Sequence, residues 1–268
     1  MTSTTPPPFE HLALTCDGRR GTLTLTRPDS LNSLTNEVMA EIIAAADWFD
    51  HQPNLRVVVV SGEGRAFCSG FNVTAFSADE PSPAGGRTPA DTGRLMADAL
   101  ERMSPVLIAR LHGHVVGGGL VLAAACDLRV CADDVRFLIP EVDLGIPLAW
   151  GGIPRLVREI GPALTKELVM TCRPFDAAEA KAAGFLNTVV PVDELDAAVE
   201  KMAEAVASRP RAAVLATKRH TNAVTEQMVG LSRSWSDADG LAIALRDPES
   251  RAAQEAYLEK LKAKNGLS

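Results

Sequence analysis

The sequence predicts an α/β fold that continues into a helical C-terminal region. Three observations support this prediction: alternating β-forming residues near the start, short apolar runs between segments of helical period, and a mostly helical pattern from Gly152 onward. With 268 residues, of which 46% are apolar and 23% charged, the chain is long enough for one large domain with a sizeable core. We expect a flexible tail over residues 1–9, the core over residues 10–208 and a helical region over residues 209–268.

The N-terminal part of the chain predicts a β-hairpin followed by a helix. The segments "HLALTC" (residues 11–16) and "TLTLT" (residues 22–26) flank an Asp-Gly turn signal. Residues 35–50 follow at helical period. Thr35 is placed to cap this helix, with Glu37 in its first turn.

The middle of the chain predicts alternating strands and helices around one long loop. "LRVVVVS" is typical of a strand that is buried on both faces. Residues 77–92 are rich in Pro, Gly, Ser and Asp, and they predict a mobile loop that borders a site. A helix from about Thr92 to Met103 then leads to the strand "PVLIARLHG", the apolar helix "GLVLAAA" and the short strands "DLRVCA" and "VRFL".

The C-terminal part predicts helices with distinct start and stop signals. Asp176 and Glu179 have the spacing of a capping box, and Gly184 ends that helix. Further helices are expected in "VDELDAAVEKMAEAVAS" and after Pro210 and Pro248.

Composition and charge exclude several functional classes. The net charge is −7 and no basic stripe is visible, which argues against nucleic acid as a partner. The five cysteines form no Cys-x-x-Cys pair, so we expect neither a disulfide framework nor a zinc site, and a reducing, cytoplasmic location. No apolar stretch reaches the ~20 residues that span a bilayer, and "MTSTTPPPFE" lacks the regions of a signal peptide, so we expect no membrane partner.

"VVGGGLVLAAACDLRV" (residues 115–130) places three consecutive glycines at a predicted strand-to-helix junction. The first turn of a helix has unpaired N–H groups and a partial positive charge, so it attracts an anion or a developing oxyanion. The spacing matches neither common phosphate loop, and close packing of the helix on the sheet is the alternative explanation. Because "SGEGRAFCSGFNV" (residues 61–73) also follows a strand, the two loops together predict an oxyanion hole for a carbonyl that becomes an enolate or a tetrahedral centre.

Several segments resemble the crotonase (enoyl-CoA hydratase/isomerase) superfamily. "RAFCSGFNV" is similar to its A-F-x-[AS]-G-x-D motif, and "HGHVVGGGLVLAAACDLRVCADDVRFLIPEVDLGI" to its signature block. "TLTRPDSLNSLT" resembles the stretch that borders the coenzyme A site, and the segment beginning "WGGIPRLVREIG" resembles the part that follows the signature block. The resemblance covers about residues 14–210, whereas the C-terminal helices match by pattern only.

The resemblance implies a fold and a substrate class. The fold is a spiral of ββα units with a helical C-terminal trimerisation region, and the assembly is a homotrimer or a dimer of trimers. The substrate is an acyl-CoA thioester of fatty-acid metabolism, such as β-oxidation, and neither a separate cofactor nor a metal is implied. The N–H groups of Phe71 and Gly118 correspond to the oxyanion hole. The family's usual Asp is Asn72 here, for which we expect a structural effect rather than a loss of function.

The carboxylates that the resemblance implies favour an isomerase. Family hydratases use two glutamates; one corresponds to Glu141, but the position of the other holds Val121. Adding water needs an acid and a base that act together, whereas one carboxylate suffices to carry a proton from C2 to C4 of a 3-enoyl-CoA. This pattern resembles the mitochondrial type of Δ3,Δ2-enoyl-CoA isomerase. In an apolar pocket beside Val121, Leu144, Ile146 and Trp150, the acid form of Glu141 is favoured.

Two alternatives stay open at this point. The first is a hydratase or other crotonase-type lyase whose second acid comes from elsewhere in the chain, and the second is a non-catalytic acyl-CoA-binding protein. Asp143 is a second acid near Glu141, but it matches no catalytic position of the family, so we interpret it as structural.

The motifs also imply substrate-binding residues. Arg27, Arg65 and C-terminal lysines such as Lys218 or Lys260 are the basic candidates for the coenzyme A phosphates. In chain order, the implied substrate-binding residues are Arg27, Leu31, Arg65, Ala66, Phe67, Ser69, Gly70, Gly117, Val121, Leu144 and Trp150.

Two other chemistries are less favoured by the sequence. His112 and His114 alternate on a predicted strand, but no third metal ligand is fixed by spacing, so we prefer a packing or pocket-wall role. Cys68 and Ser69 would need an activating base to act as nucleophiles, and the chain has no G-x-S-x-G elbow. We therefore expect Cys68 to be buried.

Overall fold

The fold is built on two β-sheets. The computed structural model of the chain describes residues 5–72, 88–232 and 234–264. Only β1 and β2 pair antiparallel in the larger sheet; its other neighbouring strands are parallel. In spatial order, the larger sheet contains β1 (Leu12–Asp17), β2 (Arg20–Leu25), β3 (Val57–Gly62), β4 (Val106–Leu111), β6 (Leu128–Ala132) and β9 (Thr188–Val190). The smaller sheet contains β5 (His114–Val116), β7 (Arg136–Leu138) and β8 (Phe175–Asp176).

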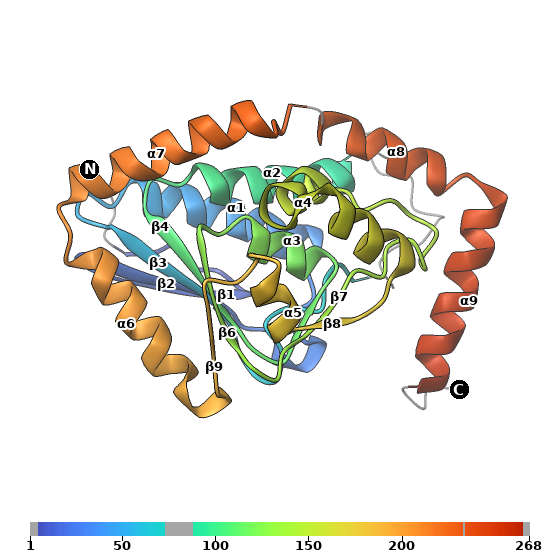
Figure 1. Cartoon of the computed structure of the whole chain (residues 1–268), viewed down its shortest axis with the longest axis horizontal. Helices are drawn as coiled ribbons and strands as arrows, with labels where there is room; N and C mark the ends of the chain where they lie inside the picture. Colours follow the sequence, from blue (N-terminus) through green and yellow to red (C-terminus); the bar gives the residue numbers. More distant parts are fainter. Residues whose placement is uncertain (1–4, 73–87, 233, 265–268) are drawn as a thin grey trace.

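Nine α-helices of the described residues surround these sheets (Figure 1). They are α1 (Asn36–Asp50), α2 (Thr88–Arg102), α3 (Gly118–Ala124), α4 (Gly152–Thr171), α5 (Ala177–Ala182), α6 (Leu195–Ala207), α7 (Arg211–Met228), α8 (Asp237–Ala244) and α9 (Pro248–Lys264). The helical C-terminal region is therefore confirmed. Within the described ranges no helix is both long and apolar enough to cross a bilayer.

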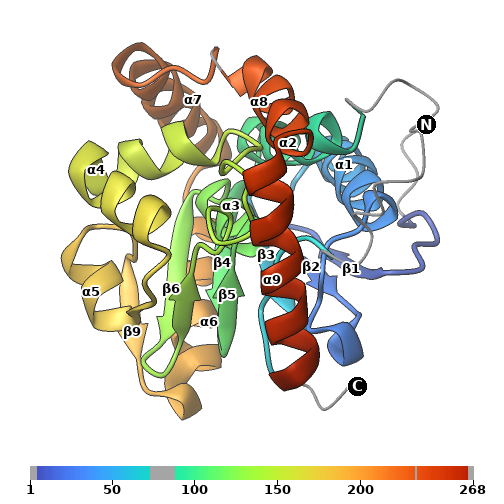
Figure 2. The ribbon, with the colours of Figure 1, turned by 90° about the vertical axis from the view of Figure 1, so that its right-hand side faces the viewer.

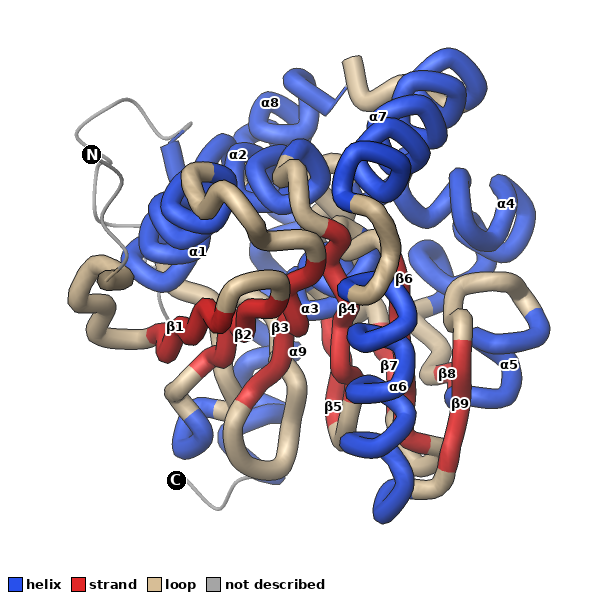
Figure 3. The backbone as a smooth tube through the Cα atoms, turned by 90° about the vertical axis from the view of Figure 1, so that its left-hand side faces the viewer, coloured by secondary structure: helices blue, strands red, loops and turns tan. Residues whose placement is uncertain are grey.

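The chain winds between the two sheets in repeated ββα units. β4 is followed by β5 and α3, and β6 by β7 and α4, so each unit adds one strand to each sheet. Helix α6 packs against β3, β4 and β6 on one side of the larger sheet, whereas the smaller sheet and α3 lie on the other side (Figures 1 and 3). This arrangement confirms the predicted spiral of ββα units.

Several local signals in the sequence are confirmed by the structure. Thr35 caps α1, because its Oγ1 accepts a hydrogen bond of 3.3 Å from the Val38 N–H. Asp176 caps α5 in the same way, with 2.9 Å between its Oδ1 and the Glu179 nitrogen. In β3, the consecutive residues Val57 and Val58 point to opposite faces and are both fully buried, as expected for a strand covered on both faces.

The structure corrects two of the predicted boundaries. The strand that precedes the glycine run is β5 of the smaller sheet, because β4 ends at Leu111 and the chain turns at Gly113, which has a φ of +60°. Residues 88–92 of the predicted loop form the start of α2, where Pro89 lies in the first turn, a position that tolerates proline. Residues 77–87 of that loop and residues 1–4 of the predicted tail lie outside the described part of the chain.

A buried ion pair joins the C-terminal helices to the sheet. The Lys218 Nζ of α7 donates to Asp127 Oδ2 at 2.7 Å and to the Pro105 carbonyl at 2.8 Å. The Leu107 N–H also donates to Asp127 Oδ2, at 2.7 Å. Burial raises the pKa of the Asp127 carboxyl, and the Lys218 ammonium opposes this shift.

We expect Lys218→Met to lower the free energy of unfolding by about 3–5 kcal/mol, because it leaves the Asp127 carboxylate buried without its cation. Urea denaturation of the purified protein measures this loss. Lys201→Met, at an exposed position of α6, is the control and should change stability by less than about 0.5 kcal/mol. Equal stability of the two variants would contradict this reading of the pair.

Candidate active site

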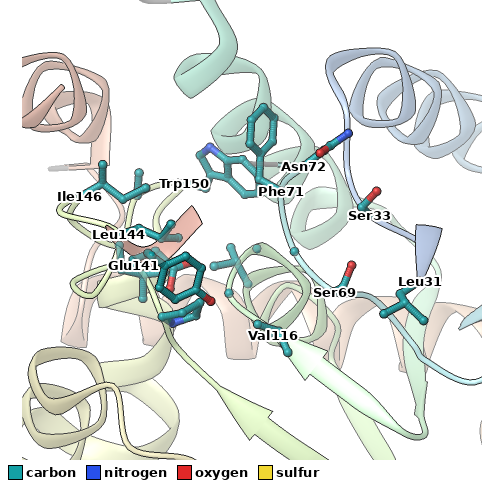
Figure 4. A pocket seen from close by; sticks show the side chains of 18 of the residues that line it. Leu31, Ser33, Ser69, Phe71, Asn72, Val116, Glu141, Leu144, Ile146 and Trp150 are labelled. Carbon is teal, nitrogen blue, oxygen red and sulfur yellow. The ribbon is translucent and has the colours of Figure 1, made fainter. Parts of the chain in front are cut away.

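A cavity of about 520 Å³ lies where the two sheets, the loop after β7 and the C-terminal helices meet. Figure 4 shows Leu31, Ser33 and Ser69 on one side of it and Glu141 and Leu144 on the opposite side. Further lining residues are Ser30, Gly70, Phe71, Asn72, His114, Val116, Gly117, Gly118, Val121, Pro140, Ile146, Pro147, Leu148, Ala149, Trp150, Leu241, Tyr257 and Leu261. The lining is apolar except for a few side chains that can form hydrogen bonds.

Each of the three consecutive glycines is required by a different neighbour. A Cβ on Gly117, which has a φ of +50°, would lie 2.5 Å from Glu141 Oε1. A Cβ on Gly118 would overlap the Trp150 ring, and one on Gly119 would overlap the backbone oxygen of Cys68. The glycines therefore serve both interpretations of the sequence: they let α3 pack closely, and they bring bare backbone to the cavity.

The two loops with the proposed oxyanion donors are in direct contact. A Cβ on Gly70 would lie 2.7 Å from the Val116 carbonyl oxygen and 3.2 Å from the Gly118 nitrogen. Gly118 is the first residue of α3, so its N–H belongs to the helix turn that lacks intrahelical acceptors. The Gly70–Phe71 peptide and the Gly118 amide thus lie next to each other at the cavity wall.

The pairing of Phe71 determines which way its amide faces. The Leu34 N–H donates to the Gly70 carbonyl at 2.8 Å, and the Asn72 N–H donates to the Leu34 carbonyl at 2.9 Å. In such a parallel bridge the N–H of the intervening residue points away from the bridging strand. The Phe71 N–H therefore faces the side opposite Leu34.

Glu141 places a carboxyl group directly beside the glycine run. It lies in the loop after β7, and its Oε1 approaches the Gly117 Cα. Its Oε2 is buried and has no hydrogen-bond partner among the described residues. Burial raises the pKa of Glu141 to about 7, well above the ordinary value of 4.5. A carboxyl group with this pKa exchanges a proton readily near neutral pH.

The Trp150 ring packs against Gly118, and hydrogen bonds hold the backbone of Trp150 and Gly151 in place. Its φ of +62° is uncommon for a bulky residue. The Arg155 Nη1 donates to the Trp150 carbonyl at 3.0 Å, and Asp237 Oδ2 accepts from the next amide, that of Gly151, at 2.8 Å. The Trp150 and Phe71 rings meet edge to face with centroids 5.8 Å apart.

Most of the residues implied by the sequence motifs meet at this cavity, but not all of them. Glu141 and both proposed oxyanion donors line it, together with Leu31, Ser69, Gly70, Gly117, Val121, Leu144 and Trp150. Ala66 and Phe67 are fully buried in the core, and neither they nor Arg27 and Arg65 belong to the cavity lining. The Arg27 guanidinium instead donates to the Ser33 carbonyl at 3.0 Å.

The structure corrects the interpretation of Lys218 and adds residues that sequence reasoning missed. Lys218 is buried in its ion pair with Asp127, so its ammonium group does not face the cavity. Tyr257 and Leu261 of α9 and Leu241 of α8 line the cavity although no motif pointed to them. The available signal was weak: Tyr257 is the one tyrosine of the sequence, in a helix rich in Ala, Glu and Lys.

The alternative nucleophile and metal ligands have other roles. Cys68 is fully buried, and burial raises its pKa to about 12, which disfavours the reactive thiolate. The His112 ring lies 3.0 Å from the Gly64 carbonyl oxygen and 3.1 Å from the Arg110 Nη1, so both of its nitrogens have neighbours. His114 lines the cavity. Among the described residues, no group of three potential metal ligands comes together.

Comparison with known proteins identifies the family of this chain. The profile of enoyl-CoA hydratase/isomerase matches residues 21–266. The chain belongs to the enoyl-CoA hydratase/isomerase family. A crotonyl-CoA hydratase of Syntrophomonas wolfei is 32% identical over 257 residues, which cover 95% of this chain and 97% of that protein. A peroxisomal Δ(3,5)-Δ(2,4)-dienoyl-CoA isomerase of Arabidopsis thaliana is 32% identical over 234 residues, which cover 81% and 83%.

Solved structures of the enoyl-CoA hydratase/isomerase family share the fold. A crystal structure of an enoyl-CoA hydratase from Mycobacterium avium subsp. paratuberculosis aligns with a TM-score of 0.84 and 26% identity, over 93% of this chain and 99% of that one. The predicted crotonase-type fold is thereby confirmed.

Gly119→Ala distinguishes helix propensity from close packing. Propensity alone would stabilise α3 by about 1 kcal/mol. We expect instead a loss of about 1–3 kcal/mol, because the new methyl group meets the backbone of Cys68, which has no room to yield. Thermal or urea unfolding measures the difference. Gly240→Ala in α8 is the control, since its Cβ would have no neighbour closer than 3.7 Å, and it should be neutral or stabilising.

The raised pKa of Glu141 also predicts a pH-dependent stability. The folded state holds this proton more tightly than the unfolded chain, so the wild type loses stability as the pH rises from about 4.5 through about 7. Glu141→Gln removes this loss. Relative to the wild type, the variant should gain about 1–3 kcal/mol between pH 5 and pH 8 in urea denaturation. Glu259→Gln, at an exposed position of α9, should keep the wild-type dependence on pH.

Proposed function

We propose that this protein is an enoyl-CoA isomerase that converts a 3-enoyl-CoA into a 2-enoyl-CoA, with Glu141 as the one proton carrier. The observation that carries the proposal is the buried Glu141 carboxyl beside Gly117, with a pKa near 7 and a hydrocarbon, Val121, where a hydratase of this family would have its second acid. The proposed substrate follows from the family and from the largely apolar cavity.

The proposed reaction needs one base and a pair of hydrogen-bond donors that stabilise the negative charge on the thioester oxygen. The thioester carbonyl accepts hydrogen bonds from the Phe71 and Gly118 N–H groups, which stabilise the negative charge that develops on its oxygen. The Glu141 carboxylate removes a proton from C2, and the electron pair spreads over a dienolate from the carbonyl to C4. The same carboxyl group then returns the proton to C4, and the double bond is left between C2 and C3. Atoms and charge balance without any further reactant.

The surroundings of Glu141 support proton transfer more than hydration. Val121 is almost completely buried in the cavity wall and carries no polar atom. Leu144, Leu148 and Trp150 continue the apolar surface. A water molecule for addition to C3 would need a second positioned acid or base, and Val121 supplies neither.

Hydration is the second candidate, because relatives such as the Syntrophomonas wolfei protein are named hydratases. The two reactions are separated by one pair of assays. Isomerisation of a 3-enoyl-CoA increases the ultraviolet absorbance of the conjugated thioester, whereas hydration of crotonyl-CoA decreases it. We expect the increase with a 3-enoyl-CoA; hydration of crotonyl-CoA without isomerisation would contradict the proposal.

Glu141→Gln should reduce the rate of isomerisation by about 10²–10⁴-fold, because it removes the general base. Binding of the substrate should stay close to that of the wild type. Asp143→Asn, an exposed carboxylate two positions further on, is the matched control and should keep the activity. For the wild type, kcat/KM should rise with pH through about 7, since the base must be ionised before it can accept the C2 proton. An active Glu141→Gln variant would exclude Glu141 as the carrier.

A further inference from the structure

The last helix of the chain closes one end of the cavity. Tyr257 and Leu261 of α9 belong to the cavity lining. Apart from Leu241 of α8, the other lining residues come from the first 150 residues of the chain. Figure 1 shows α9 at the right-hand edge of the molecule, where it follows α8, and in Figure 2 the same helix faces the viewer. Most of its outward positions are exposed.

A tight contact fixes α9 at its first turn. Gly145 has a φ of +70°, and a Cβ on it would lie 2.7 Å from the Ser250 Cα. Tyr257 and Leu261 follow Ser250 by seven and eleven residues, which places all three on one face of a helix with 3.6 residues per turn. The contact at Gly145 therefore directs this face toward the cavity.

Tyr257 and Glu141 both line the cavity, and they are close enough for the charge of Glu141 to act on the Tyr257 phenol. Burial raises the pKa of the Tyr257 phenol, and the charges of Asp143 and Glu141 add to the shift. The side chain of Ile146, which also lines the cavity, packs with Leu241 of α8 in a small apolar cluster. Helices α8 and α9 and the loop that carries Glu141 thus form one wall.

The chemistry assigns this wall to the acyl chain. In the proposed reaction Glu141 reaches C2 and C4, which lie on the acyl side of the thioester carbonyl. The serine-lined side across the cavity is then left to the coenzyme A part of the substrate (Figure 4). An acyl chain that runs past Glu141 meets the apolar wall with Tyr257 and Leu261.

We propose that α9 of the same chain forms the end wall of the acyl part of the site, and that Tyr257 and Leu261 set the longest acyl chain that the site accepts. This inference rests on the proposed function, because it takes the ligand to be an acyl-CoA. It needs no proton transfer, so binding alone tests it.

Calorimetric titration of the full-length protein with saturated acyl-CoA thioesters, from butyryl to myristoyl, tests the assignment. For the wild type we expect about fourfold tighter binding for each added methylene up to a limiting length, beyond which affinity stops rising. In Tyr257→Ala/Leu261→Ala the rise should continue to longer chains at about the same fold per methylene. In Leu261→Trp it should stop at a shorter chain than in the wild type.

Two further variants control for indirect effects on the helix. Leu258→Ala removes a half-buried side chain of α9 that does not line the cavity, and Tyr257→Phe keeps the ring; both should keep the wild-type limit. If the limiting chain length is unchanged both in Tyr257→Ala/Leu261→Ala and in Leu261→Trp, the inference is overturned while the proposed function stays intact. A wild-type protein that binds no acyl-CoA would instead contradict the proposed function.

Discussion

The whole site depends on how closely backbone and side chains approach at Gly117, Gly118 and Gly119. A methyl group at any of these positions would meet a different neighbour: the Glu141 carboxyl, the Trp150 ring or the Cys68 backbone. These neighbours come from three separate segments of the chain, so the glycine run is the point where the segments lock together. Because cores are packed densely, such contacts leave little freedom to the groups around them.

This packing also explains the electrostatics of Glu141. Oε1 lies over Gly117, and Oε2 is buried with no partner in the described part of the chain. An ionised carboxylate in that position is disfavoured, which is why its pKa is raised to about 7. The buried Glu141 carboxyl therefore lowers stability at neutral pH, whereas the ion pairs of Arg155 with Asp98 and Glu101 stabilise the region around Trp150.

The sequence predicts well those features that depend on residues close together in the chain, such as helix caps and hairpins. The caps at Thr35 and Asp176 depend on contacts three residues apart, and the hairpin of β1 and β2 depends on a turn signal between two alternating segments. The two loops of the proposed oxyanion hole and Glu141 are predicted from motifs that resemble a family, because composition and periodicity alone also allow a purely structural role for the glycines.

What the sequence could not give depends on contacts between distant segments. Strand β5 has three residues after a glycine turn, too few for a periodic pattern, and it exists because β7 pairs with it. Tyr257 and Leu261 reach the cavity only because α9 is held at Gly145, a contact that no local pattern announces. Lys218 illustrates the opposite error: a lysine in a helix predicts an exposed cation, yet Asp127 binds it in the interior.

The most direct test is the titration of the Glu141 carboxyl carbon by nuclear magnetic resonance in protein labelled with carbon-13 glutamate. The resonance is assigned as the one that disappears in Glu141→Gln. We expect a midpoint near pH 7, because the carboxyl group is buried beside Gly117. A midpoint near the ordinary value of 4.5 would show a solvated carboxylate and would contradict the central claim.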